Sequence, residues 1–116
     1  MNKNSLVIES RIWIRGSRGA YLGEGRIALL RAIDREGSLT KAAASMSMSY
    51  LKAWRLLHSM NSQAGRPLTV QFIGGVGGGG THLTPAGREA IEVYTELKRN
   101  CDQYLIKELN RVARRL

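Results

Sequence analysis

The chain has 116 residues, 43% of them hydrophobic, which is enough for one small domain with a modest core. Its 18 Lys and Arg residues against 9 Asp and Glu residues give a formal net charge of +9, which favours nucleic acid or an anionic membrane surface as partner. The single cysteine, Cys101, excludes an internal disulfide, and no apolar run approaches the roughly 20 residues of a membrane span, so we expect a cytoplasmic protein without a membrane partner.

The first predicted elements are a hairpin and a helix. Apolar and charged residues alternate from Leu6 to Ile14, and turn residues follow, which predicts a β-hairpin over residues 6–22. The spacing then becomes helical, with Ile27, Leu30 and Ile33 three residues apart. We therefore predict a helix over residues 24–36 that ends at Gly37 in a left-handed C-cap.

A helix-turn-helix is predicted over residues 38–65. Ser38 is a suitable N-cap for its first helix, and Ser47 or Ser49 for its second. The two helices of such a motif cross closely, and the second enters the major groove of DNA. The close crossing requires small residues, which the sequence supplies at Ala42, Ala43 and Ala53.

The next stretch, residues 68–83, is predicted to form two strands around a glycine-rich tip. The tip is not a nucleotide-binding loop, because no Gly-Lys-Ser/Thr sequence opens a helix after it. A glycine-rich hairpin after a helix-turn-helix is typical of a wing, whose backbone N–H groups approach a phosphate or the minor groove. The predicted wing residues are Gly74, Gly75, Val76, Gly77, Gly78, Gly79 and Gly80.

The last predicted element is one long helix over residues 85–116, capped by Thr84 with Pro85 at its first position. It would be roughly 45 Å long, more than the width of so small a domain. Its apolar stripe therefore predicts a second copy of the chain as partner, with Cys101 as a buried thiol. The predicted dimer interface comprises Tyr94, Leu97, Cys101, Leu105, Leu109, Val112 and Leu116.

Residues 37–88 contain no Asp or Glu, and a surface that lies against phosphates excludes carboxylates. Lys52 or Arg55 on the second helix could read guanine, while Thr40 and Lys41 suit a phosphate. The predicted DNA contacts are Thr40, Lys41, Ser49, Tyr50, Lys52, Arg55 and Ser59. We expect no enzyme, metal or cofactor, because His58 and His82 lack partners at metal-ligand spacing and no nucleophile–base pair is evident.

Several segments together resemble the DNA-binding domain of the ModE molybdate-responsive regulators, and less closely the LysR-type winged helices. The resemblance covers nearly the whole chain and implies a dimeric winged helix-turn-helix transcription regulator that binds a two-fold DNA site. By position, Ser49, Tyr50 and Lys52 would be recognition-helix contacts, and residues 74–80 the wing. The segments are residues 22–34 and 37–43, Met48-Ser49-Tyr50, Ala53-Trp54, Met60-Asn61, residues 77–80 and Leu83-Thr84-Pro85-Ala86-Gly87-Arg88.

Three features depart from that family. Ser47 stands in the turn where glycine is common, and Val76 stands in the wing where lysine is common. The full-length regulators also carry a separate C-terminal oxyanion-binding domain, whereas this sequence ends at Leu116. The resemblance therefore does not extend molybdate binding to these residues.

The sequence thus predicts one mainly α domain with small β elements (α+β) over residues 1–116, a winged helix-turn-helix with an N-terminal hairpin and a long C-terminal dimerisation helix. We expect a homodimeric, sequence-specific regulator of double-stranded DNA without its own effector domain. Two alternatives are an architectural protein that coats DNA with little sequence preference and a protein-interaction adaptor that has lost DNA binding.

Overall fold

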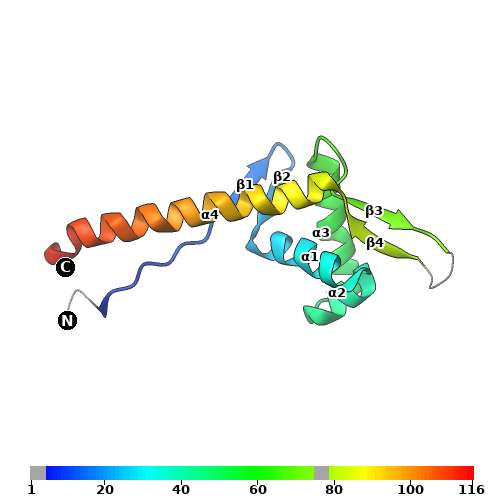
Figure 1. Ribbon diagram of the computed structural model, residues 1–116, viewed down its shortest axis with the longest axis horizontal. Helices are drawn as coiled ribbons and strands as arrows, with labels where there is room; N and C mark the ends of the chain where they lie inside the picture. The colour runs from blue at the N-terminus through cyan, green and yellow to red at the C-terminus, as the bar shows by residue number, and fades with distance from the viewer. Residues whose placement is uncertain (1–4, 75–78) are drawn as a thin grey trace.

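The structure is a computed structural model that describes residues 5–74 and 79–116 (Figure 1). It confirms the predicted class, an α+β winged helix-turn-helix with a long C-terminal helix. Two small antiparallel sheets, β1–β2 and β3–β4, flank the helices. In chain order the elements are β1 (Trp13–Gly16), β2 (Gly19–Gly23), α1 (Glu24–Glu36), α2 (Leu39–Ser45), α3 (Tyr50–Gln63), β3 (Thr69–Phe72), β4 (Gly80–Leu83) and α4 (Pro85–Val112), and a short 3-10 turn (Ala113–Arg115) follows.

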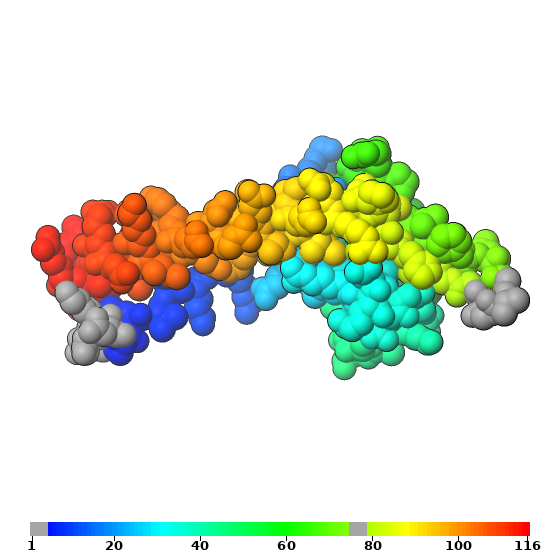
Figure 2. Space-filling model, viewed as in Figure 1, coloured from blue at the N-terminus to red at the C-terminus, as the bar shows by residue number. Residues whose placement is uncertain are grey.

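The strands of the N-terminal hairpin begin at Trp13 rather than at residue 6. Residues 6–12, which we call the N-terminal arm, instead run alongside α4 (Figures 1 and 2). The hydroxyl of Tyr94 on α4 donates to the carbonyl of Ile12 at 3.0 Å, and Ser10 Oγ donates to Asp102 at 2.8 Å. Even-numbered arm residues are half-buried and odd-numbered ones exposed, so the predicted alternation is present, with a helix as its partner.

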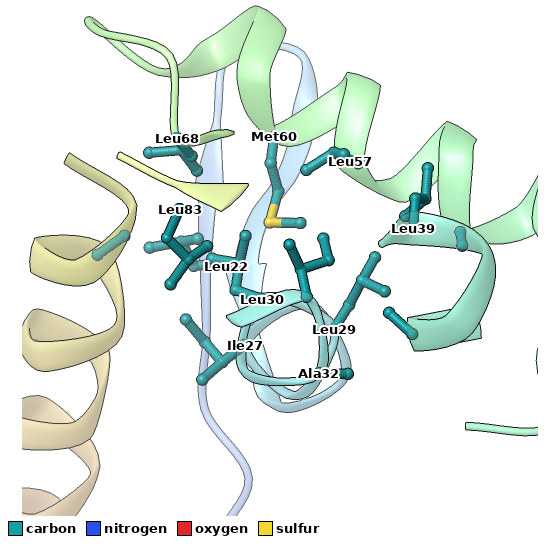
Figure 3. Packing of buried hydrophobic residues seen from close by; sticks show 14 of the residues in the cluster. Leu22, Ile27, Leu29, Leu30, Ala32, Leu39, Leu57, Met60, Leu68 and Leu83 are labelled. Carbon is teal, nitrogen blue, oxygen red and sulfur yellow. The ribbon is translucent and has the colours of Figure 1, made fainter. Parts of the chain in front are cut away.

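The core lies between α1, α3 and the bases of the two sheets (Figure 3). Leu29, Leu30 and Ile33 of α1 have no exposed surface, because the apolar stripe of this helix is covered on several sides. Met60 is also fully buried and points from α3 toward Leu30 (Figure 3). Its flexible side chain fills the space that the branched residues leave.

Side-chain caps set the starts of α2 and α3. Ser38 accepts a hydrogen bond from the Lys41 N–H at 3.2 Å, and Ser49 accepts one from the Lys52 N–H at 3.1 Å. Of the two serines proposed for α3, Ser49 is therefore the N-cap. At the other end of α1, Gly37 closes the helix with φ of 71°, which is the predicted left-handed cap.

The molecule is elongated, with principal dimensions of 62 × 28 × 22 Å. Its radius of gyration is 17.9 Å, whereas about 13 Å is expected for a compact domain of this length. The 28-residue α4 is the cause, because its C-terminal half projects beyond α1–α3 and lies beside the arm alone (Figure 2). None of the helices in the described ranges combines the length and apolar character that crossing a membrane requires.

Candidate nucleic-acid interface

The turn between α2 and α3 is tight and contains Ser47 in a left-handed conformation, with φ of 53°. Among residues 5–74 and 79–116, Ser47 is the only residue other than glycine with positive φ. Backbone bonds hold it there, from the Ser47 N–H to Ala44 at 3.1 Å and from the Met48 N–H to Ala43 at 2.9 Å. A left-handed conformation costs an L-residue roughly 1–2 kcal/mol, which explains why glycine suits this position.

Three alanines lie where α2 and α3 cross. Ala42, Ala43 and Ala53 expose 2% of their surface or less, as the sequence predicts for a close crossing. Met46 and Met48 of the connection are half-buried against the same core. Burial of this inner face leaves the opposite face of α3 to solvent.

The predicted contact residues are exposed in all but one case. Ser59 is half-buried, and its hydroxyl accepts a hydrogen bond from the Arg26 guanidinium at 3.0 Å. It lies on the flank of α3 that faces α1, where Arg26 covers it. The exposed residues are Thr40, Lys41, Ser49, Tyr50, Lys52 and Arg55.

Arg26 is a basic residue of this surface that the sequence reasoning missed. It lines a groove together with Trp13, Met48 and Lys52, so α1 and the hairpin adjoin the lysine flank of α3. The groove depends on how α1 packs against α3. The position of Arg26 near the start of α1 was the only hint in the sequence that it belongs to this surface.

The basic residues on the outer surface of α2 and α3 form no ion pair with any acidic side chain that the structure describes. Within the described part of the chain, four ion pairs form, and none involves Lys41, Lys52 or Arg55. Arg88, at the edge of the acid-free stretch, differs because it pairs with Asp34 at 3.1 Å. Lys41, Lys52 and Arg55 on α2 and α3 therefore keep their positive charge available to a polyanion.

Exposed apolar and aromatic residues interrupt this basic face. Leu51 and Trp54 expose 53% and 43% of their surface. The Trp54 ring stacks on His58 with ring centroids 4.8 Å apart and an interplanar angle of 6°. In the sequence Trp54 stands out only within a family motif, although its spacing from Arg55 and Leu51 places it near the same face.

The wing strands pair in register Thr69↔Leu83 through Phe72↔Gly80. β4 also contacts the α1–α2 connection, where the Thr81 N–H donates to the Gly37 carbonyl at 3.1 Å. A Cβ on Gly80 would lie 2.5 Å from that carbonyl, which accounts for glycine there. Gly74 has φ of 73° and Gly79 is exposed. The remaining predicted wing residues, Gly75, Val76, Gly77 and Gly78, lie outside the described residues.

The residues of the predicted stripe on α4 fall into three groups by burial. Tyr94 is 5% exposed and belongs to the core of its own protomer, where burial raises the pKa of its hydroxyl. It is therefore not part of a free surface. Leu97 and Leu116 are exposed, whereas the residues between them are half-buried: Cys101, Leu105, Leu109 and Val112.

An ion pair attaches the arm to α4. Lys98 contacts Asp102 at 2.7 Å, and both side chains also bond to Ser10. The hydrogen bonds from Lys98 and Ser10 hold the pKa of Asp102 below its ordinary value, and the bond to Asp102 raises the pKa of Lys98. The pair therefore remains charged at neutral pH.

The order of α1, α2, α3 and a β3–β4 hairpin, with a basic, carboxylate-free outer helix, defines a winged helix-turn-helix domain of the DNA-binding type. Residues 25–88 match the model of the bacterial regulatory helix-turn-helix proteins of the LysR family, and the chain belongs to that family.

Similar proteins confirm the resemblance to ModE. The chain is 45% identical over 80 residues to the molybdenum transport protein ModE of Azotobacter vinelandii, a match that covers 69% of this chain and 30% of that protein. It is 43% identical over 76 residues to the molybdenum-pterin-binding protein MopB of Rhodobacter capsulatus, covering 66% and 28%. It is 34% identical over 91 residues to the transcriptional regulator ModE of Haemophilus influenzae, covering 78% and 36%. The matches thus span about a third of these relatives.

Proposed function

We propose that the chain is a sequence-specific, double-stranded-DNA-binding transcription regulator that acts as a homodimer. The observation that carries this proposal is the outer face of α3, which presents Lys52 and Arg55 without an acidic neighbour between residues 37 and 88. Membership of a family of bacterial regulatory helix-turn-helix proteins supports the same function.

Each exposed residue has a different task in this proposal. Arg55 and Lys52 reach base edges, where a guanidinium or ammonium group suits guanine O6 and N7. Thr40 and Lys41, in the first turn of α2, bind a phosphate and set the register of the protein on the duplex. Ser49 and Tyr50 begin α3, the end of a recognition helix that enters the major groove.

Selection of bound sites from a random DNA pool, followed by titration of the recovered site, tests the assignment. We expect Arg55→Ala to cost about 1–3 kcal/mol and to relax the sequence preference at one position. Lys41→Ala should weaken binding to all sequences alike and lower the salt dependence by about one phosphate contact. Arg99→Ala, on exposed α4, is the matched control and should change neither quantity. Equal affinity of wild type and both interface variants would contradict the assignment.

Dimerisation is proposed to involve the exposed apolar side of α4. Val93, Leu97 and Tyr104 expose 40%, 46% and 63% of their surface and are spaced four and seven residues apart, so they share one side of the helix. A dimer that binds a two-fold site requires its two recognition helices to lie about 34 Å apart, one turn of DNA.

Light scattering at micromolar concentration tests the dimer. Leu97→Glu and Tyr104→Glu should shift the particle from dimer to monomer, because each buries a carboxylate in the interface. Ile106→Glu is the control, since residue 106 lies nine positions from Leu97, about half a turn away around the helix. A monomeric wild type, or equal dissociation by all three variants, would exclude this side of α4.

Two further outcomes separate the proposal from its alternatives. A large excess of random competitor DNA should leave a discrete footprint, whereas an architectural protein would lose it. No binding to any duplex at low salt would favour a protein-interaction adaptor. Molybdenum appears in the names of the Azotobacter and Rhodobacter relatives, and that property belongs to those proteins. For these residues we propose no catalysis and DNA affinity that molybdate does not change.

A further inference from the structure

The first two turns of α3 expose large apolar side chains at the place where DNA is proposed to bind. Tyr50, Leu51 and Trp54 expose 50%, 53% and 43% of their surface. Leu51 contributes nothing to the core cluster, although it lies two residues from the fully buried Ala53. An apolar group of this size on an otherwise basic helix indicates a contact surface.

The chemistry of the major groove suggests what this surface contacts. The C5-methyl group of thymine is the main apolar feature that base edges present there. Leu51 and Trp54 are three residues apart on α3, so their side chains are neighbours on the helix surface. Arg55 follows directly and would reach a hydrogen-bonding edge beside the methyl group.

The Trp54 ring packs against a neighbour on its own helix. It stacks on His58, one turn further along α3, with an interplanar angle of 6°, which favours one plane of the indole. A ring that is held before binding loses less conformational freedom when it docks.

We propose that Leu51 and the edge of Trp54 form an apolar reading surface for thymine 5-methyl groups, with His58 as the positioning residue for Trp54. The inference rests on the proposed DNA binding and adds how part of the sequence is read. A protein partner is a poorer match, because Lys52 and Arg55 flank these residues and the 52 residues 37–88 hold no carboxylate.

The test uses the site that the wild-type protein selects from random DNA. Each thymine of one half-site is replaced in turn by deoxyuridine, which removes only the methyl group. At one or two positions, wild type should bind about three- to fivefold more weakly, the effect of one buried methyl group. For Leu51→Ala or Trp54→Ala, the loss at the corresponding position should fall below about twofold.

Two controls make the outcome specific. Lys52→Ala should bind more weakly but retain the full deoxyuridine effect, because it removes a polar contact beside the apolar ones. His58→Ala should reduce the deoxyuridine effect at the Trp54 position while the unfolding midpoint stays unchanged, whereas a purely structural role would move the midpoint.

Two results would overturn the inference: a wild type that is indifferent to every deoxyuridine, or a deoxyuridine effect that persists unchanged in both Leu51→Ala and Trp54→Ala. The latter includes the case in which these residues contact a protein instead. If the selection recovers no enriched sequence, the proposed DNA-binding function fails, which is a different result from methyl-indifferent binding to a defined site.

Discussion

Substitution of Gly87 by alanine should destabilise the protein, although alanine is the better helix former. Gly87 lies in the first turn of α4, beneath the start of the wing. A Cβ there would meet the carbonyl oxygen of Leu68 well inside van der Waals contact and would lie 3.1 Å from its carbon. That carbonyl cannot easily turn away, because it accepts a hydrogen bond from the Thr84 N–H at 3.0 Å.

The net effect is the difference of two terms. Insertion of a methyl group into a well-packed contact costs about 1–3 kcal/mol, and the upper half applies when the neighbour is backbone. Replacement of a helical glycine by alanine returns about 1 kcal/mol. We therefore expect Gly87→Ala to lower the free energy of unfolding by about 1–2 kcal/mol.

Gly25→Ala is the matched control, because Gly25 also lies in the first turn of a helix and an added Cβ meets nothing within 4 Å. It should raise the free energy of unfolding by about 0.5–1 kcal/mol. Thermal unfolding followed by circular dichroism, at one protomer concentration, should separate the two variants by about 10 °C. If Gly87→Ala proves as stable as Gly25→Ala, the inference that the Leu68 carbonyl leaves no room for a Cβ at residue 87 is refuted.

Three further predictions concern the turn and the arm. Ser47→Gly should raise the free energy of unfolding by about 0.5–1 kcal/mol, because the relief of about 1–2 kcal/mol of left-handed strain exceeds the added freedom of the unfolded chain. Ser47→Val should lower the free energy of unfolding, because a β-branched residue suits the left-handed conformation poorly. Urea unfolding of both variants measures these two changes. Asp102→Asn should speed tryptic cleavage after exposed Arg11, because the arm loses its ion pair, while Glu108→Gln should leave the rate unchanged. The pKa of Asp102 is lowered in the folded protein, so the ion pair stabilises the arm above the ordinary carboxyl pKa of about 3.9. This stabilisation is lost as the pH falls through the folded-state pKa. Protection of the wild-type arm, followed by hydrogen exchange, should therefore weaken below about pH 4.

The helix-turn-helix was predictable because its signals are local. Caps at Ser38 and Ser49 and small residues at Ala42, Ala43 and Ala53 depend only on positions a few residues apart. The same is true of the left-handed cap at Gly37. Local chemistry of this kind determines the elements before any tertiary contact is considered.

The arm and the flank of α3 could not be predicted in the same way. A period-two pattern shows that one side of residues 6–12 is covered, but not whether a strand or a helix covers it, and the cover is formed by residues such as Tyr94, 82 positions beyond Ile12. Likewise, Ser59 lies on the outer half of a helical wheel, yet Arg26 reaches it from α1. Both outcomes depend on long-range packing.

The bases of the wing connect the recognition helix to α4. The Asn61 amide on α3 accepts from the Leu68 N–H at 2.8 Å, which holds α3 against the start of the wing. On the other side, Thr84 donates to the Pro67 carbonyl at 2.6 Å and caps α4 by accepting from the Gly87 N–H at 3.1 Å. Residues 67 and 68 are thus hydrogen-bonded both to Asn61 of α3 and to Thr84, the N-cap of α4. If two copies join through α4, the separation of their recognition helices is set by these short bonds, so the spacing of DNA half-sites becomes a property of the folded domain itself.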